Sequence, residues 1–260
     1  MIAQFDAVNE VSESFKKLFK GYTWLLGGPT TAGAFLMTIV IFVAVGASMI
    51  PTFWKVITSQ GQLPELSPTQ VAFMVIGVTI AVIFAIVVSA FTYGWTLVAA
   101  EPVWLGREPA FDRGFYRAAS KLLTLVAFLL LVAFMSVITL ITIVGPIVIG
   151  VMTIYGPCFI LFKDRSAIEA IGDTFRLASE NIGPTIILVL AFVAIYIAGF
   201  MTIFIVSLVP LMGLIGIPLQ FAFQWLLSAF VALAVVRFYD LLLTGKGSAP
   251  PYPLVPENRV

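Results

Sequence analysis

Charged residues divide this sequence into four long uncharged stretches, at positions 21–54, 66–100, 122–162 and 181–236. A helix needs roughly 20 residues to cross a bilayer core about 30 Å thick. The first two stretches, of 34 and 35 residues, each suit one crossing, whereas the third and fourth, of 41 and 56 residues, each hold two. The pattern therefore predicts an all-α integral membrane protein with six transmembrane helices.

Proline and glycine mark where the two longer stretches turn back. They lie near the middle of each stretch, as Gly145-Pro146 in the third and as Pro210, Gly213, Gly216 and Pro218 in the fourth. Because proline lacks a backbone donor and interrupts a helix, we expect a turn at each place and hence three helical hairpins. At positions 210–218 a re-entrant segment is the alternative, which requires other helices to shield its backbone.

Positive charges fall almost entirely on one side of this six-span arrangement. Of the 14 Lys and Arg residues, Lys55 alone lies on the other side. The thirteen on the side of the termini are Lys16, Lys17, Lys20, Arg107, Arg113, Arg117, Lys121, Lys163, Arg165, Arg176, Arg237, Lys246 and Arg259. Since cytoplasmic segments carry the positive excess, both termini are predicted to be cytoplasmic (N-in, C-in). We also expect no cleavable signal peptide, with the first span acting as its own insertion signal.

Three short charged segments with helical periodicity precede the predicted hairpins. Aligned without gaps, positions 12–19, 112–119 and 172–179 share a pattern that places Phe15, Phe115 and Phe175 in register. Their charged residues lie opposite the apolar ones, as in helices that lie in a membrane interface. We therefore expect three units, each a cytoplasmic interfacial amphipathic helix plus a hairpin. The units are 8–100, 111–163 and 167–243, within one membrane domain at 1–243.

Composition narrows the chemistry further. The chain is 61% hydrophobic and 10% charged, whereas soluble domains carry about 25% charged residues. Its net charge of +1 gives no reason to expect nucleic acid as a partner. There is no histidine, which excludes imidazole ligation and Ser-His or Cys-His nucleophiles, and the single cysteine, Cys158, is expected to be a buried apolar residue. We predict no cofactor, no metal site and no enzyme activity.

Two segments resemble a known group of membrane proteins. They are YGPCFILFKDRSAIEAI at positions 155–171, continued by Thr174-Phe175-Arg176-Leu177 and Asn181, and GREPAFDRGF at positions 106–115. They are similar to recurrent segments of a loose superfamily of six-span bacterial and archaeal proteins of unknown function. It includes the YciC-like inner-membrane proteins and the membrane domain fused to some glycerophosphodiester phosphodiesterases. The resemblance implies the six-span fold; the fused enzymes carry their activity on a separate soluble domain, for which this chain has no room.

A few polar residues are candidates for contacts with lipid or other helices. Basic residues of the three amphipathic segments could contact anionic lipid headgroups; they are Lys16, Lys17, Lys20, Arg113, Arg117, Lys121 and Arg176. Gln220 and Gln224, four residues apart in the sixth span, are expected to form intramembrane polar contacts. The carboxylates Glu101, Glu108 and Asp112 lie among arginines, which favours local ion pairing over a hydrolytic site.

These observations favour a non-catalytic component of the bacterial cytoplasmic (inner) membrane. We expect an accessory or scaffolding subunit that associates with membrane lipids and with other membrane proteins or a second copy of itself. A small transporter, channel or lipid-translocating protein is the alternative, and a lipid enzyme using Glu101, Asp112 and Asp164 is a weaker third. The cytoplasmic tail at 244–260 is rich in Gly and Pro and cannot be helical; a fixed tail would need the protein's own cytoplasmic face or a partner.

Overall fold

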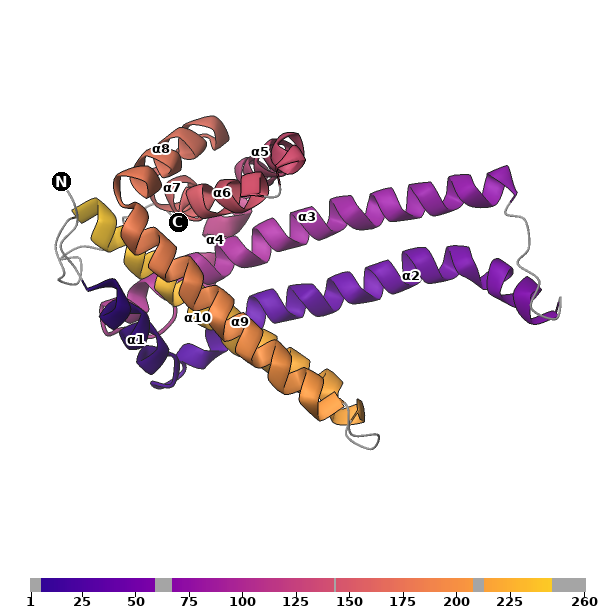
Figure 1. The fold of residues 1–260 in the computed structure, drawn as a ribbon, viewed down its shortest axis with the longest axis horizontal. Coiled ribbons are helices and arrows are strands. Elements are labelled where there is room, and N and C mark those ends of the chain that lie inside the picture. Colours follow the sequence, from indigo (N-terminus) through magenta and orange to yellow (C-terminus); the bar gives the residue numbers. More distant parts are fainter. Residues whose placement is uncertain (1–5, 59–66, 143, 208–212, 245–260) are drawn as a thin grey trace. The chain divides into compact units, whose positions relative to one another are not determined.

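The structure is a computed structural model that describes residues 6–58, 67–142, 144–207 and 213–244, and it is helical with no strand in these ranges (Figure 1). The long helices are α2 (Gly28–Thr58), α3 (Pro68–Trp104), α5 (Leu122–Ile138), α9 (Ile182–Ser207) and α10 (Gly213–Thr244). The shorter ones are α1 (Ala7–Leu18), η1 (Thr23–Gly27), α4 (Phe111–Ser120), η2 (Thr139–Ile141), α6 (Val144–Thr153), α7 (Gly156–Lys163) and α8 (Ala167–Glu180). Thr244, the first residue of the tail predicted at 244–260, is instead the last residue of α10, and residues 245–260 lie outside the described ranges.

Within the described residues, six helical segments are long and apolar enough to cross a membrane, which agrees with the predicted number. They are Thr23–Val43, Val71–Trp104, Leu122–Ile141, Val144–Lys163, Ile182–Val206 and Pro218–Thr244. The chain is therefore compatible with a multi-pass membrane protein. Its orientation in a membrane remains a prediction.

The three segments predicted to be amphipathic form the short helices α1, α4 and α8. Local capping explains where two of them begin. The Asp6 carboxylate accepts hydrogen bonds from the backbone N–H groups of Val8 and Asn9, and Ser166 and Glu169 form a reciprocal capping box at the start of α8. The position of these helices at a membrane surface stays a prediction.

The chain forms two compact units, and each is described by itself. The smaller unit, residues 32–89, contains most of α2 and the first part of α3. Within it the Ser89 hydroxyl donates to the Met37 sulfur at 3.6 Å, while large apolar side chains such as Phe42 and Phe73 are exposed. Large exposed apolar side chains such as these suit contact with acyl chains or with another membrane protein.

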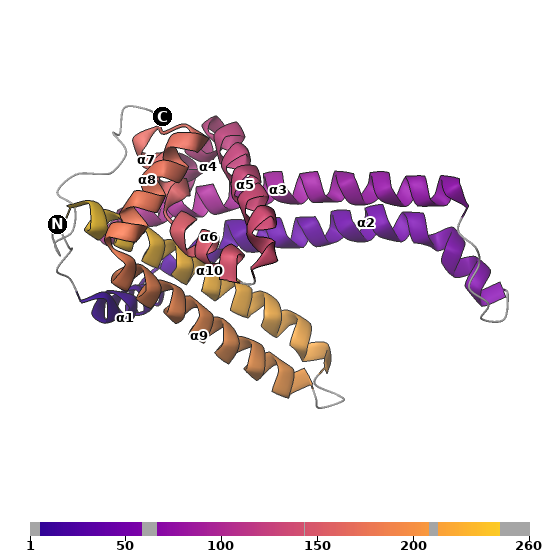
Figure 2. The same ribbon diagram turned by 45° about the horizontal axis from the view of Figure 1, so that its top comes forward.

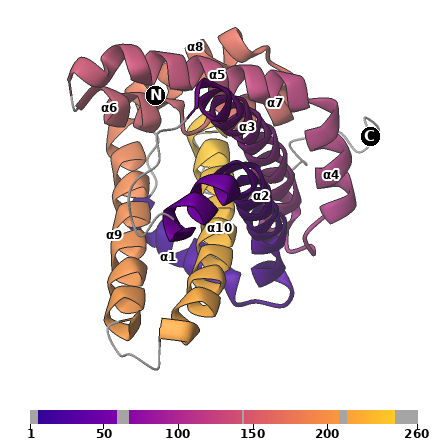
Figure 3. The same cartoon turned by 90° about the vertical axis from the view of Figure 1, so that its right-hand side faces the viewer.

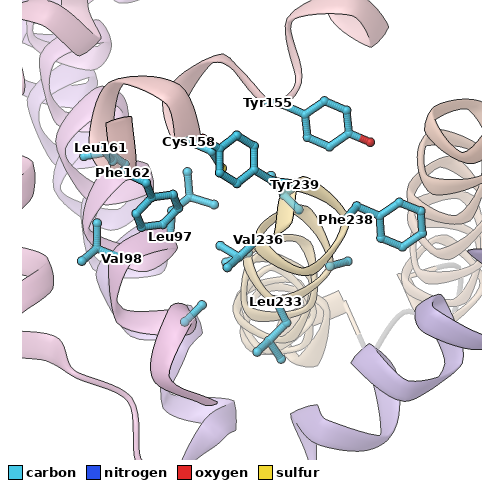
Figure 4. Close-up of a cluster of buried hydrophobic side chains, with 14 of the residues drawn as sticks. Leu97, Val98, Tyr155, Cys158, Leu161, Phe162, Leu233, Val236, Phe238 and Tyr239 are labelled. Atoms are coloured by element: carbon cyan, nitrogen blue, oxygen red, sulfur yellow. The ribbon is translucent and has the colours of Figure 1, made fainter. Parts of the chain in front are cut away.

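The larger unit, residues 1–31 with 90–260, is centred on α10. In the most apolar stretch of α10, 72% of the residues are buried, against 6% for its antiparallel neighbour α9. Figure 2 and Figure 3 show α9 and α10 side by side. The core is apolar: Leu97 of α3, Leu161 of α7 and Leu233 of α10 are wholly buried. Figure 4 shows side chains of α3, α7 and α10 meeting in this core.

The turns within the longer stretches differ in detail from the prediction. Gly145 and Pro146 lie in the first turn of α6, just after the turn that separates it from α5. The fourth candidate span is not one helix, because it breaks at Tyr155 and restarts with Pro157 in the first turn of α7. Residues 213–218, predicted to belong to a turn or a re-entrant segment, instead begin α10; residues 208–212 lie outside the described ranges.

Close packing of α4 on the end of α3 depends on a glycine. The Trp95 indole N–H donates to the Phe111 carbonyl at 2.8 Å, which fastens the start of α4. A Cβ at Gly114 would lie 2.7 Å from the Trp95 carbonyl oxygen and 3.3 Å from the Ala99 nitrogen. At Gly172, the glycine of α8, a Cβ would meet no atom within 4 Å.

These two glycines give a matched pair of substitutions. Gly114→Ala should lower the free energy of unfolding by about 1–3 kcal/mol, because α4 must move away from the backbone of α3. Gly172→Ala should raise it by up to about 1 kcal/mol, since alanine favours the helix and meets no obstacle. Denaturation of both variants in detergent, followed by circular dichroism, measures the difference. Equal effects at the two positions would contradict the packing described for α4.

Candidate functional site

Three buried polar side chains interrupt the apolar sequence of α10 in its last turns: Arg237, Tyr239 and Asp240. Arg237 forms an ion pair with Glu10 of α1, at 2.8 Å between Nε and Oε2 and 3.4 Å between Nη2 and Oε1. Both partners are almost enclosed, with side-chain exposures of 9% and 13%. In such surroundings a single unpaired charge is strongly destabilising, so each of these residues requires the other.

The Trp104 ring, at the end of α3, lies beside this ion pair. Its indole N–H donates to the Leu233 carbonyl at 3.0 Å, which joins α3 to α10. The Lys17 ammonium and the Arg237 guanidinium carbon each lie 4.8 Å from the ring centroid, within cation–π range. The ends of α1, α3 and α10 are therefore held together by one tryptophan and two cations.

Lys17 is fixed more firmly than a surface lysine. Its ammonium donates to the Val103 carbonyl at 3.1 Å, and the side chain is half-buried. Burial lowers the pKa of Lys17, and repulsion by Lys20 and then Arg237 lowers it further. The lowered pKa therefore reflects mainly the removal of the Lys17 ammonium from water, with a smaller contribution from the neighbouring positive charges.

A second charged group links α4 to the end of α7. Arg117 is 8% exposed, and its Nε donates to the Leu161 carbonyl at 2.8 Å. Its Nη2 lies 2.7 Å from the Asp164 carboxylate, and Lys121 Nζ lies 2.7 Å from the same oxygen. The hydrogen bond from Lys121, together with Arg117, holds the pKa of the Asp164 carboxyl below its usual value despite partial burial.

The carboxylates considered for a hydrolytic site have separate roles. Glu101 pairs with Arg113 at 3.2 Å, which confirms local ion pairing at this position. Asp164 pairs with Arg117 and Lys121, and Asp112 is exposed on α4. The structure thus gives Glu101 and Asp164 their own basic partners. In the described part of the chain, no group of three His, Cys, Asp or Glu side chains is placed to hold a metal ion.

The residues predicted to contact lipid headgroups fall into three environments. Arg113, Arg117 and Lys121 form the ion pairs above, and exposed Lys16 pairs with Glu13 at 2.7 Å. Lys17 and Lys20 line a pocket of about 300 Å³, and Arg176 lines another of about 530 Å³ between α7, α8 and the end of α10. Contact of any of them with lipid stays a prediction.

The two glutamines of the sixth span are exposed. Neither Gln220 nor Gln224 makes a side-chain hydrogen bond within the described residues. Near them, the Trp225 indole N–H donates to the Trp24 carbonyl at 2.7 Å, which joins α10 to η1. A polar contact from either glutamine would therefore have to reach a group outside the described part, and it remains a prediction.

Two buried polar groups in α10 are unexpected. The Tyr239 hydroxyl and both Asp240 carboxylate oxygens are buried and form no hydrogen bond within the described ranges. Phe159 packs edge-on against the Tyr239 ring at 5.0 Å between centroids, so the ring belongs to the apolar core. An unsatisfied buried polar group costs about 1–3 kcal/mol, so the Tyr239 hydroxyl and the Asp240 carboxylate lower the stability of this end of α10.

Comparison of the chain with protein-family models, with curated proteins and with solved structures finds no match. The resemblance to the six-span superfamily therefore stays an expectation.

Sequence reasoning missed the residues at the centre of this charged region. Trp104, Glu10 and Asp240 were not distinguished, and Arg237 was counted as a charge for orientation alone. One signal was present, because Arg237 and Asp240 interrupt an otherwise apolar helix that runs on to Leu243. The partner was not detectable locally, since Glu10 lies 227 positions away in the sequence.

The ion pairs of Asp164 predict a pH dependence. A carboxyl whose pKa is lower in the folded than in the unfolded state stabilises the fold above the unfolded pKa, about 3.9. That stabilisation is lost as the pH falls through the lowered folded-state pKa. Asp164 has a φ of 57°, a conformation that asparagine also tolerates, so Asp164→Asn removes the charge without new backbone strain.

We therefore expect Asp164→Asn to lower the melting temperature at pH 6–7, by an amount that shrinks as the pH falls below about 3.9. Thermal unfolding in detergent across this range measures the difference from the unaltered protein. Asp112→Asn, at an exposed position, controls for the substitution itself. A difference for Asp164→Asn that is the same at every pH would contradict the electrostatic explanation.

Proposed function

We propose that this chain is a non-catalytic accessory or scaffolding subunit of the bacterial cytoplasmic membrane, which associates with other membrane proteins and with lipids. In this proposal its six spans form three hairpins, each preceded by an amphipathic helix at the cytoplasmic surface. Both termini face the cytoplasm, as the distribution of basic residues predicts. Most charged residues then lie at one membrane face, where several of them hold helix ends together.

The filled core around α10 carries this proposal. A pathway for a solute would need a polar passage between helices, whereas most of the side chains buried in the larger unit are apolar. Among them Leu97, Leu161, Leu233 and Phe238 are wholly buried. Interiors packed in this way leave few voids larger than a water molecule. This part of the chain therefore suits a structural role better than transport.

An aromatic row on α9 supports association with another membrane protein. Tyr196, Phe200 and Phe204 follow one another at intervals of four residues, with successive rings stacked at 6.5 Å between centroids. All three side chains are more than half exposed. Aromatic residues are enriched at protein interfaces because they bury a large area with little loss of conformational entropy.

A small transporter, channel or lipid-translocating protein is the second candidate. The observation in its favour is the buried Asp240, because ionisable residues within membrane spans often mark transport pathways. It would need further polar groups along α10, but Gln220 and Gln224 are exposed and not directed into the core. The filled core therefore weighs against it.

Native mass spectrometry of the protein, extracted gently from its own membrane, tests the proposal. We expect a complex of fixed stoichiometry with other polypeptides. Phe200→Leu with Phe204→Leu should weaken that complex by roughly tenfold or more, as loss of aromatic anchors does. Phe134→Leu, at an exposed site on α5 outside the row, should leave it unchanged. Recovery of only monomers or homo-oligomers would contradict the accessory role and favour transport.

A further inference from the structure

A pocket with charged walls lies between α7, α8 and the end of α10. Its volume is about 530 Å³, within the range typical of small-molecule sites. It is lined by Lys163, where one candidate span ends, and by Leu243, beside the end of another. Glu180, at the end of α8, also lines it, just before a third span begins at Ile182. The pocket therefore lies at the ends of three spans, the level at which a helix that crosses a bilayer meets the lipid headgroups.

Five charged side chains line this pocket, and two of them neutralise each other. Arg165 pairs with Asp173 at 2.9 Å. The other three are Lys163, Arg176 and Glu180, and all of them are exposed. Within the described part of the chain, none of these three forms an ion pair. Two positive groups and one negative group are thus available to a ligand.

The buried Asp240 carboxylate balances the remaining positive charge. It is close enough to Lys163 to interact with it electrostatically. Together with Asp240, the pocket has three positive and three negative charges in and around it. Electrostatic complementarity therefore favours a ligand with one charge of each sign over a simple anion.

Arg176 and Glu180 present opposite charges on one face of α8. They are four residues apart, so their side chains are neighbours on the helix surface. Glu180 is the last residue of α8, where the free backbone carbonyls carry partial negative charge and favour a cation. A positive group of the ligand is therefore expected beside Glu180, and a negative group beside Arg176 and Lys163.

Two leucines of α10 add an apolar edge to the pocket. Leu242 is buried, whereas Leu243 is 41% exposed, and both belong to the lining. Apolar surface beside charges of both signs suits an amphiphile, because its chains leave water where its headgroup is bound.

We propose that this pocket binds the headgroup of a zwitterionic phospholipid with a primary amine, such as phosphatidylethanolamine. Arg176 and Lys163 donate charge-assisted hydrogen bonds to the phosphate, and Glu180 accepts hydrogen bonds from the ammonium. Leu242 and Leu243 contact the first carbons of the chains. A quaternary ammonium has no N–H to donate and is typically bound by an aromatic cage instead. The inference rests on the proposed membrane location and lipid association, but not on the presence of protein partners.

Isothermal titration calorimetry of the detergent-purified full chain tests this proposal. The probes are the dihexanoyl forms of phosphatidylethanolamine, phosphatidylcholine and phosphatidylglycerol. We expect the first to bind about tenfold more tightly than the other two, because they lack the hydrogen bonds of a primary ammonium to a carboxylate. Free phosphoethanolamine should bind about tenfold or more weakly than its lipid, since it buries no methylene groups.

Two variants separate the roles of the charged residues. Glu180→Ala should weaken binding of phosphatidylethanolamine by about tenfold, and binding of phosphatidylglycerol should stay unchanged or become tighter. Arg176→Ala should weaken binding of all three lipids, because each carries the phosphate. Both side chains are exposed, so the fold should be retained. Asp112→Ala is the matched control: it removes an exposed carboxylate outside the pocket and should change affinity by less than about twofold.

Four results would overturn the proposal. The first is that no probe binds, and the second is equal affinity for the three lipids. The third is a loss in Glu180→Ala that is the same for phosphatidylethanolamine and phosphatidylglycerol. The fourth is equal affinity for free phosphoethanolamine and its lipid, which would assign the pocket to a soluble compound.

These results are independent of the test of the accessory role by native mass spectrometry. A chain recovered without protein partners can still select phosphatidylethanolamine, and a complex of fixed stoichiometry can form without that selectivity. Failure of one proposal is therefore distinguishable from failure of the other.

Discussion

The ion pair between Glu10 and Arg237, enclosed beside Trp104, is the interaction on which the larger unit depends. A charge at the end of an apolar helix must be neutralised where water is largely excluded. Arg237 is neutralised by a carboxylate from the other end of the sequence, which holds α1 against α10. Trp104 then joins the end of α3 to the same place through its bond to Leu233.

Charge and core thus have complementary roles along α10. Its middle contributes apolar side chains such as Leu233 and Val236, which fix its neighbours through contact area without directional preference. Its last turns contribute Arg237, whose ion pair with Glu10 forms only when α1 lies in one position against α10. The ion pair therefore specifies which helix ends meet, while the apolar core supplies most of the stabilisation.

The number of spans was predictable because length and lack of charge impose it directly. The ends of the helices were harder to predict. Helix α3 continues past Glu101 to Trp104, and α10 continues past Arg237 to Thr244. A sequence shows a charge but not the partner that neutralises it, so the uncharged stretches underestimate the lengths of these two helices. The break before Pro157 was missed because Tyr155 and Gly156 lie in an uninterrupted apolar run. The pocket lined by Lys17 and Lys20 forms where two segments far apart in the sequence come together on folding, which no local pattern reveals.

The most direct test of this account is the stability of Glu10→Gln compared with Glu13→Gln, measured by unfolding in detergent. Both substitutions remove a carboxylate from α1, but Glu10 is enclosed with Arg237 whereas Glu13 forms an exposed pair with Lys16. We predict that Glu10→Gln lowers the free energy of unfolding by about 3–5 kcal/mol and that Glu13→Gln leaves the unfolding transition unchanged. Adding Arg237→Gln to Glu10→Gln should then cause less further loss than Arg237→Gln alone. If Glu10→Gln proved as mild as Glu13→Gln, the buried ion pair could not be what holds α1 to α10.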